Sequence, residues 1–472
     1  MERYVVKTSL LAVALLLFAC AETKNTDTDH DTIVDGDDAV TDADIDTARV
    51  FTQRRILGEG GFFGISSSAG NDDYFIIGAH YAELSATPGE NPSGKVYLYK
   101  KGTIPTLFSD AETVLTHPDE RPGAGFGYTI GGYCDLNCDG AADFAVSAHL
   151  DSVGDTPNCG TIALFFGGDA DPATAVLSLP DGVRRQSDVM GQSLVCFDID
   201  GDGCDDLVAG GQNAGPNDTG LIAVWKGAAA GPAAEPAFYM EAQLAENKQY
   251  LGASLAVGDV DGDGTPDLVA GGWGLKKDAA AANTGGVYLY KTGDDWSQGP
   301  SAVLFPDETV AQEVGFGSKV ILFTVDGVTY IAVMAPDYNQ EAGAVFIYYF
   351  ASGAFRSHAM FKPSTYGDPV YGISDIAFSP DFGGKGKGAL LIGHKYYGAD
   401  STGAVTAVSF PEWTPVVITA EPPVSGDTFG AMVKDIGDIN GDGLADFVVG
   451  TPEHIEGDFE TGTQPGGIVL LY

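Results

Sequence analysis

One acidic loop pattern occurs four times in this chain, and it limits what the chain can fold into. The segment 259–272, DVDGDGTPDLVAGG, places aspartates at positions 259, 261, 263 and 267 and ends in an apolar run. Carboxylates at this spacing repel each other strongly unless a cation neutralises them. Ca²⁺ accepts about six to eight oxygen ligands in tolerant geometry, and Gly262 and Gly264 permit tight turns between the ligands. The segment predicts a nine-residue calcium loop followed by a buried strand.

The other three copies begin at Asp135, Asp198 and Asp438. Side chains at loop positions one, three, five and nine and the carbonyl oxygen at position seven are the expected ligands. They are Asp135, Asn137, Asp139, Ala141 and Asp143; Asp198, Asp200, Asp202, Cys204 and Asp206; Asp259, Asp261, Asp263, Thr265 and Asp267; and Asp438, Asn440, Asp442, Leu444 and Asp446. We expect about four Ca²⁺ ions that stabilise the fold, the alternative being acidic turns without metal.

A longer repeat surrounds these loops. An apolar or aromatic residue followed by glycine recurs seven times, from Phe63-Gly64 to Phe429-Gly430, at steps of 55 to 65 residues. Each unit contains three short strand-like runs separated by turn residues, and a less regular fourth run completes most units. Such a period is typical of a repeat array or propeller. We therefore predict an all-β fold, a seven-bladed β-propeller of four-stranded antiparallel blades over residues 47–472.

The two ends of the propeller are expected to meet. The last unit stops after its third strand, at Gly466–Tyr472, and the segment Arg49–Gly58 precedes the first Phe-Gly pair. An N-terminal strand that joins the last blade closes the ring and removes an open sheet edge. Small residues such as Ser66, Thr129 and Ser193 recur two positions after the repeat glycine, which suits a crowded central axis.

The N-terminus is predicted to be a targeting signal rather than part of the fold. Arg3 and Lys7 precede an apolar run, Ser9–Ala19, that is too short to span a bilayer. The run ends in Leu-Phe-Ala-Cys, which resembles the lipobox of bacterial lipoproteins. This predicts a signal peptide over 1–19 and a lipid-anchored Cys20, with Ala21 favouring the outer membrane or cell surface. An ordinary cleaved signal is the alternative. Residues 20–46 are acidic and nearly free of aromatics, and we expect a disordered tether.

The charge balance limits the partners. Lys and Arg total 24 against 66 Asp and Glu, giving a formal net charge of -42. This argues against nucleic acid or an anionic membrane surface as a partner. We expect an extracytoplasmic monomer with a protein or glycan ligand.

The combination of Phe-Gly, a DxDxDG loop and a following Gly-Ala-Pro-like end resembles FG-GAP repeats. These repeats build the N-terminal propeller of integrin α chains and many bacterial surface proteins, and the resemblance covers roughly residues 49–472. The first, fifth and sixth units lack the ligand spacing, so those blades are expected to be metal-free. The Gly-Ala-Pro element matches only weakly in this chain, and Met334-Ala335-Pro336 is among its best matches.

In the integrin family the ligand binds on the face opposite the calcium loops. Loops between the second and third strands should open on that face here. The candidate ligand residues at or near these strand ends are His80, Tyr81, His149, Gln212, Trp273, Tyr338, Lys395 and Tyr396. Packing of the loop bases is the alternative role for each of them. A transition metal shared by His80 and His149 lacks a third ligand.

Five cysteines follow Cys20, so one thiol is left unpaired. Cys196 and Cys204 flank one loop and are candidates for a bridge across it, and Cys134–Cys138 is the other candidate bridge, although connectivity cannot be read from sequence.

We find no GxSxG, HExxH or P-loop pattern. We therefore predict a non-catalytic adhesion or scaffolding module. The alternative is a polysaccharide- or phosphodiester-active enzyme that uses the same loop face, since propellers do host catalytic groups.

Overall fold

The fold is described from a computed structural model of the chain. It describes residues 51–58, 63–64, 66–68, 73–80, 93–167, 174–243, 248–278, 283–306, 314–338, 342–362, 372–382, 388–398, 400–410, 414–452 and 466–472. The predicted signal peptide, tether and Cys20 therefore lie outside the described residues, as does Tyr81.

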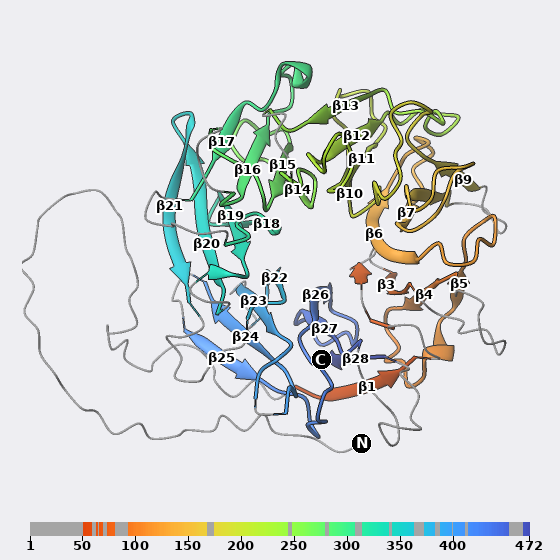
Figure 1. Cartoon of the computed structure of the whole chain (residues 1–472). Helices are drawn as coiled ribbons and strands as arrows, with labels where there is room; N and C mark the ends of the chain where they lie inside the picture. The colour runs from red at the N-terminus through yellow and green to blue at the C-terminus, as the bar shows by residue number, and fades with distance from the viewer. Residues whose placement is uncertain are drawn as a thin grey trace, which may run out of the picture.

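Seven four-stranded antiparallel sheets form the molecule and are arranged around a centre (Figure 1). Blade one contains β2 (Ser66–Ser68), β3 (Tyr74–Ala79), β4 (Lys95–Lys100) and β5 (Thr113–Leu115). Blade two contains β6 (Phe126–Cys134), β7 (Asp143–Ala148), β8 (Thr161–Phe165) and β9 (Thr174–Leu177). Blade three contains β10 (Ser193–Phe197), β11 (Asp206–Gly211), β12 (Leu221–Trp225) and β13 (Phe238–Glu241).

The remaining blades follow the same order. Blade four contains β14 (Ser254–Gly258), β15 (Asp267–Gly272), β16 (Gly286–Tyr290) and β17 (Ala302–Leu304). Blade five contains β18 (Lys319–Val325), β19 (Val328–Ala335), β20 (Ala344–Ala351) and β21 (Ala354–Phe361). Blade six contains β22 (Asp375–Ser379), β23 (Ala389–His394), β24 (Ala404–Ser409) and β25 (Pro415–Ile418). Blade seven contains β26 (Met432–Gly437), β27 (Asp446–Gly450), β28 (Gly467–Leu471) and β1 (Gln53–Leu57). The predicted all-β, seven-bladed propeller is confirmed.

Ring closure between the two ends of the chain is also confirmed. Strand β1 pairs with β28 in antiparallel register from Gln53 with Leu471 to Leu57 with Gly467. The two strands come from opposite ends of the sequence and are neighbours in the last blade. Figure 1 shows β1 beside β28. An ion pair between Arg55 and the fully buried Asp427, at 2.6 Å, ties β1 to the segment that precedes β26.

The metal-free hairpin of blade five has a physical explanation. Strands β18 and β19 are joined by Asp326 and Gly327, which both have positive φ angles, of 51° and 77°. Positive φ at both central residues is the requirement of a type I′ turn, for which Asp-Gly is a preferred sequence. The corresponding segments of blades one and six fall largely outside the described residues.

In blades one, three, four, six and seven, neighbouring blades approach each other so closely that only a glycine fits at the contact, whereas Ser147 stands at this position in blade two. A Cβ atom on Gly210 of β11 would lie 2.0 Å from the carbonyl oxygen of Gly252, the repeat glycine of the next blade. Gly78, Gly271, Gly393 and Gly450 stand in the same relation to the repeat glycines of their next blades, at 2.1 to 2.3 Å. The Gly/Ala clusters that end the second strands therefore serve contacts between blades.

The small residues two positions after the repeat glycine also join one blade to the next. The hydroxyl groups of Ser66, Thr129, Ser193 and Ser374 donate to carbonyl oxygens of Gly127, Gln192, Gly252 and Gly430, at 2.7 to 2.9 Å. Ser254 instead accepts from the backbone N–H of Val320 at 3.0 Å. In blade five the position is Lys319, which forms an ion pair with Asp375 of blade six. The expected crowding at the axis is thus accompanied by a belt of polar contacts.

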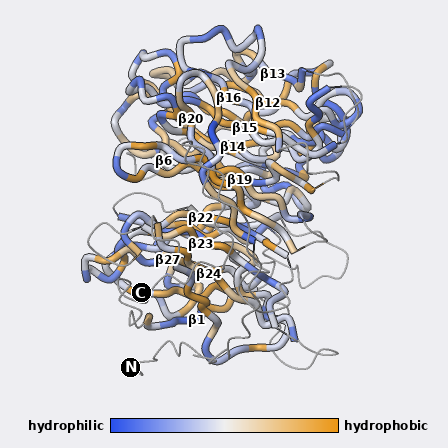
Figure 2. Tube along the Cα trace, turned by 90° about the vertical axis from the view of Figure 1, so that its left-hand side faces the viewer, coloured by the Kyte–Doolittle hydropathy of each residue, from blue (hydrophilic) through white to orange (hydrophobic). Residues whose placement is uncertain are grey.

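In the six repeat pairs whose first residue the structure describes, that residue is part of the core between blades. Phe63, Phe126, Met190, Leu251, Phe316 and Phe429 are all fully buried. Apolar residues follow the strands, and hydrophilic residues gather in the connecting loops (Figure 2). Two short 3₁₀ helices, Phe108–Asp110 and Trp296–Gln298, are the helices among the described residues, and neither is long and apolar enough to cross a membrane.

A glycine substitution tests the contact between blades. Gly210→Ala should lower the free energy of unfolding by roughly 3 kcal/mol, because its Cβ would overlap a backbone oxygen that cannot move alone. Gly182→Ala is the control for a Cβ that meets nothing, since no atom lies within 4 Å of its Cβ position; its φ is positive, unlike that of Gly210. The control should lose only about 1–2 kcal/mol. Equal losses in denaturant unfolding would contradict the role assigned to this contact.

Candidate metal centres and ligand face

The four acidic loops connect first strands to second strands and therefore share one face of the propeller. They lie between β6 and β7, β10 and β11, β14 and β15, and β26 and β27. The aspartate at loop position nine is the first residue of each second strand: Asp143, Asp206, Asp267 and Asp446. All four are buried. The start of the strand thus carries one carboxylate into the interior beneath each loop.

Backbone N–H groups fold each loop around its carboxylates. In the loop of blade four, the two oxygens of Asp259 accept from Gly262 at 2.8 Å and from Gly264 at 2.9 Å. Asp263 accepts from Thr265 at 2.8 Å, and Asp267 accepts from Val260 at 3.1 Å. The loops at Asp198 and Asp438 repeat these contacts. The local sequence therefore orients the carboxylates before any ligand is considered.

Two loops bring three carboxylates together as a cation site requires. One oxygen each from Asp198, Asp200 and Asp206 lie within 4.8 Å of one another, and Asp259, Asp261 and Asp267 form the same arrangement. Burial raises the pKa of Asp206 to about 6 and also raises the pKa of Asp267. A nearby positive charge would lower the free-energy cost of keeping each carboxylate ionised. An all-oxygen donor set is the kind that Ca²⁺ prefers. The residues present fit a bound Ca²⁺ ion.

The other two loops have an asparagine at position three, Asn137 and Asn440. The amide of Asn137 donates to Asp139 at 2.8 Å, and the amide of Asn440 donates to Asp442 at 3.2 Å. Their buried aspartates, Asp143 and Asp446, accept backbone N–H groups as in the first two loops. These two loops share the fold of the carboxylate-rich loops and carry one charge less.

Two lysines form ion pairs with the carboxylate-rich loops, and neither ion pair was predicted from the sequence. Lys226, directly after β12, forms an ion pair with Asp200, and Lys291, directly after β16, lies 2.8 Å from Asp261. Hydrogen bonding to Asp261 raises the pKa of the Lys291 ammonium group. Each lysine comes from the end of the third strand, about 25 to 30 residues after its partner, so loop spacing alone gives no signal for it.

The two predicted disulfides are wrong in their pairing. Cys134 is bonded to Cys196, and Cys138 is bonded to Cys204. Both bonds join blade two to blade three, because the loops of adjacent blades lie side by side. The backbone N–H of Asp135 donates to the carboxylate of Asp205 at 2.9 Å, and the N–H of Asp205 donates to the carbonyl oxygen of Asp135 at 3.0 Å.

One of these bonds connects the metal loops themselves. Cys138 occupies loop position four with φ of 58°, where the other loops have Gly201, Gly262 and Gly441. Cys204 occupies position seven of the next loop, where the expected ligand is its carbonyl oxygen. The expectation of one unpaired thiol is met within the described residues by Cys159, which is buried.

The second-to-third loops open on the opposite face, since strands in each blade are antiparallel. His80 and His149, which follow the second strands of blades one and two, have ring centroids 5.8 Å apart. Tyr128 packs on His149 at 3.8 Å, and its hydroxyl accepts from Gln192 at 3.0 Å. Both histidines are more than nine-tenths buried. Among the described residues, no carboxylate or cysteine completes a three-ligand metal site with this pair.

The structure brings other predicted ligand residues together in pairs. Trp273 of blade four donates through Nε1 to Gln212 of blade three at 3.1 Å and stacks on Tyr250 at 3.7 Å. In blade six, Lys395 lies over the ring of Tyr396, which is 44% exposed. Tyr338 packs against Phe346 in blade five. The loop face thus offers aromatic rings near blades three, four and six, and histidines near blades one and two.

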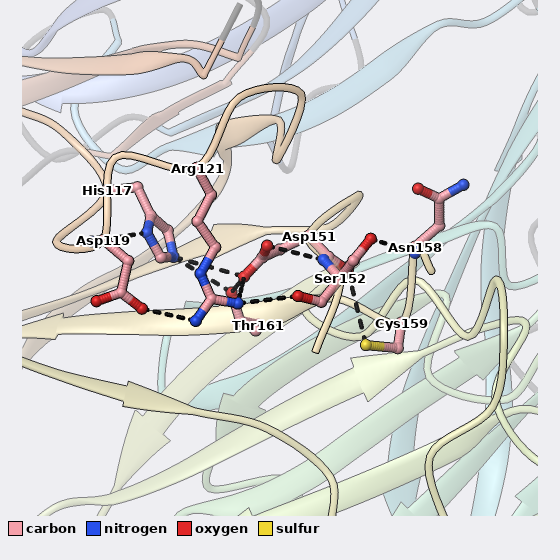
Figure 3. Close-up of polar contacts among 8 residues, drawn as sticks. All are labelled: His117, Asp119, Arg121, Asp151, Ser152, Asn158, Cys159 and Thr161. Carbon is pink, nitrogen blue, oxygen red and sulfur yellow. Dashed lines mark hydrogen bonds and ion pairs between the residues drawn. The ribbon is translucent and has the colours of Figure 1, made fainter. Parts of the chain in front are cut away.

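A buried polar cluster supports the same face in blade two, as Figure 3 shows. Asp151 accepts from Thr161 at 2.8 Å and from Arg121 at 3.2 Å, and Arg121 also donates to Asp119 at 2.7 Å. The N–H of Asp119 donates to Nδ1 of the buried His117 at 3.2 Å, which leaves Nε2 to donate toward Thr161 at 3.4 Å. Burial lowers the pKa of His117. The cluster fixes the start of the loop that follows β7 and was not expected from the sequence.

Removal of calcium should destabilise the propeller. Each site that releases its ion loses the stabilisation of ligand binding, about 2.7 kcal/mol per ion at a calcium concentration of 100 times Kd. The melting temperature with Ca²⁺ and with excess EGTA, together with metal counting by native mass spectrometry, checks this expectation. An unchanged melting temperature and no bound metal would mean that the acidic loops are ordinary turns.

Lys291 should weaken calcium binding in blade four, because a cation 2.8 Å from Asp261 repels a second cation in the same loop. Lys291→Met is expected to tighten calcium binding at that site by about three- to tenfold, as measured by calorimetric titration. Lys100→Met, which removes an exposed lysine at the end of β4, is the control and should leave the titration unchanged.

The loop face should lose stability in acid. Burial lowers the pKa of His149 to about 4, whereas an unfolded histidine titrates near 6.5. The unfolded chain therefore binds more protons between these values, so stability is complete above pH 6.5 and falls as the pH drops to 4. The loss from this residue should reach about 3 kcal/mol at pH 4. His149→Gln should flatten this part of the pH profile in denaturant titrations, and an unchanged profile would contradict the assignment.

Comparison with known proteins agrees with the repeats. An FG-GAP-like repeat matches residues 198–270, and the FG-GAP repeat matches residues 251–290 and 435–472. These segments include the acidic loops of blades three, four and seven. The loop of blade two lies outside the matched segments.

The chain is similar to parts of integrin alpha subunits. It is 26% identical to integrin alpha-5 of Xenopus laevis over 223 residues, which is 44% of this chain and 21% of that protein. It is 33% identical to integrin alpha-PS5 of Drosophila melanogaster over 181 residues, which is 36% of this chain and 16% of that protein. It spans about a fifth or less of the length of the relatives it matches. The chain is thus a seven-bladed β-propeller that matches FG-GAP repeats over residues 198–290 and 435–472 and is similar to parts of integrin alpha subunits.

Proposed function

We propose that this protein is a non-catalytic, calcium-stabilised binding module of the cell surface. Its ligand is a protein or a glycan, and the ligand binds on the face opposite the acidic loops. The observation that carries the proposal is that the two faces of the propeller carry different kinds of side chain. Carboxylates that fit Ca²⁺ gather on one face, and aromatic, histidine and lysine side chains from neighbouring blades gather on the other.

The chemistry of the loop face supports a macromolecular ligand. Trp273 and Tyr250 form a stacked pair held by Gln212, so the indole ring keeps a fixed orientation. Tyr396 adds an exposed ring beside the ammonium group of Lys395. Rigid aromatic rings bury large areas at a small cost in conformational entropy, and they are common anchors in protein and glycan recognition.

Calcium serves the scaffold in this proposal. The expected ions, about four, sit where first and second strands join, and their carboxylates also accept backbone N–H groups. A bound ion would neutralise aspartates that the fold buries. The loop face is thereby held by a ring whose shape depends on calcium, and no step of ligand binding requires contact with the metal.

The location proposed for this module is extracellular, with an anchor at the N-terminus. Two disulfides suit an oxidising compartment, and the net charge of -42 disfavours nucleic acid as a partner. Lipidation of Cys20 would hold the propeller at the outer membrane or cell surface. Mass spectrometry of the mature N-terminus, with Cys20→Ala as the control, would distinguish a diacylated cysteine from an ordinary cleaved signal.

Arrays of glycans and secreted proteins test the ligand face directly. We expect the calcium-loaded protein to bind a subset of these molecules, and Trp273→Ala and Tyr396→Ala to reduce that binding at least about tenfold, since anchor residues contribute 2 kcal/mol or more. Lys226→Ala, on the opposite face, is the matched control and should bind as the unaltered protein does. Binding that Lys226→Ala abolishes and the loop-face variants retain would place the ligand on the metal face and contradict the proposal.

A further inference from the structure

The central channel contains positive charge that the proposed ligand face does not use. A cavity of about 590 Å³ is lined by the first strands β6, β10, β14 and β18 and by Lys434 of β26. Lys319, the first residue of β18, lines the same cavity. The chain has 24 basic and 66 acidic residues, so most of its surface is negatively charged and repels anions. A channel lined by two lysines is therefore a local exception.

The two lysines differ in their partners. Lys319 pairs with Asp375, and the other carboxylate oxygen of Asp375 accepts from the backbone N–H of Val433 at 2.9 Å. Among the described residues, the side chain of Lys434 has no hydrogen-bond or ion-pair partner, and its charge interacts only at longer range with Lys319, Asp375 and Asp435. The neighbouring Asp435 accepts from Gly437 at 2.9 Å, and the positive charge of Lys101 also acts on it. One ammonium group in the channel therefore lacks a counter-charge of its own.

The surroundings of Lys434 disfavour its charge. Its side chain reaches solvent because the channel is open, but the channel walls surround it. Burial and the nearby charge of Lys319 lower the pKa of the Lys434 ammonium group, while Asp375 and Asp435 act in the opposite direction. A bound anion would offset the repulsion between the two ammonium groups.

The walls of the cavity offer further donors. Each first strand is the end strand of its sheet, so its inner backbone edge has no strand partner. Ser254 adds a hydroxyl group to the lining, whereas the Ser318 hydroxyl already donates to the carbonyl oxygen of Met334 at 3.3 Å. Between these polar groups the wall is apolar, with Ile130, Leu194 and Leu255. The cavity is larger than a single ion needs, and its lining suits an anionic group that carries a short organic part.

We propose that the central channel is a binding site for an oxyanion, a carboxylate or a phosphate group, held between Lys434 and Lys319. The oxyanion belongs either to a small organic acid or ester that enters freely or to an acidic side chain that a polypeptide inserts. This site is separate from the loop-face site, and it does not depend on the function proposed above.

Calorimetric titration of the full, calcium-loaded protein tests the site. The probes are acetate and inorganic sulfate, the latter standing in for phosphate because calcium phosphate precipitates, and sodium chloride keeps the ionic strength constant. Both probes should bind the unaltered protein, and Lys434→Met should weaken both at least about tenfold, the effect of losing one charge-assisted hydrogen bond. Lys100→Met, the surface control, should bind as the unaltered protein does. No binding to the unaltered protein, or equal binding to Lys434→Met, overturns the proposal.

Two further measurements keep the test decisive. Lys434→Arg preserves the charge and should retain binding, so a loss in Lys434→Met that Lys434→Arg shares would indicate a structural role and overturn the proposal. A capped peptide with a single glutamate among glycines distinguishes the two sources. Competition between this peptide and acetate identifies an inserted acidic side chain, and binding of acetate alone identifies a small free acid.

Discussion

The close approach of each blade to the next is the constraint on which the rest of the structure depends. A seven-bladed ring closes only if every blade keeps the same distance from its neighbours, and here a second-strand glycine touches the backbone of the following repeat glycine. Beside that contact, a hydroxyl group two positions after the repeat glycine of one blade donates to the carbonyl oxygen of the repeat glycine of the next blade. The buried Phe, Met and Leu residues of the repeat pairs then pack beside it. The spacing of the repeats follows from this single contact.

The acidic loops are a consequence of how each blade turns between its inner strands. Placing an aspartate at the first residue of the second strand buries a carboxylate, and backbone N–H groups alone do not remove the cost of burying its charge. A cation in the loop removes that cost. Blade five shows the alternative, since an Asp-Gly turn joins its strands without any buried carboxylate at this point. An acidic loop that could hold a cation and a tight Asp-Gly turn are thus two solutions for the same connection.

Much of the fold could be predicted from the sequence because the repeat is local. Strand order, blade number and ring closure follow from the spacing of the Phe-Gly pairs and from the incomplete last unit. The position of the acidic loops was equally accessible. The pairing of Cys134 with Cys196 was not, because it depends on which loops lie side by side in space. The same holds for Lys226 and Lys291, which reach the loops from third strands, and for the Asp151 cluster, whose members come from two different connections of blade two.

The ring is closed by different kinds of bond at different places. Covalent bonds join blades two and three, whereas blade seven is completed by non-covalent contacts alone: the backbone hydrogen bonds between β1 and β28, the ion pair of Arg55 with Asp427 and apolar packing of Phe51 and Ile56. A pulling force on the N-terminal segment enters the molecule at β1, far along the ring from the disulfides. Mechanical load would therefore be borne first by the non-covalent junction of β1 with β28, and a propeller tethered by its N-terminus would yield there while its cross-linked blades stayed together.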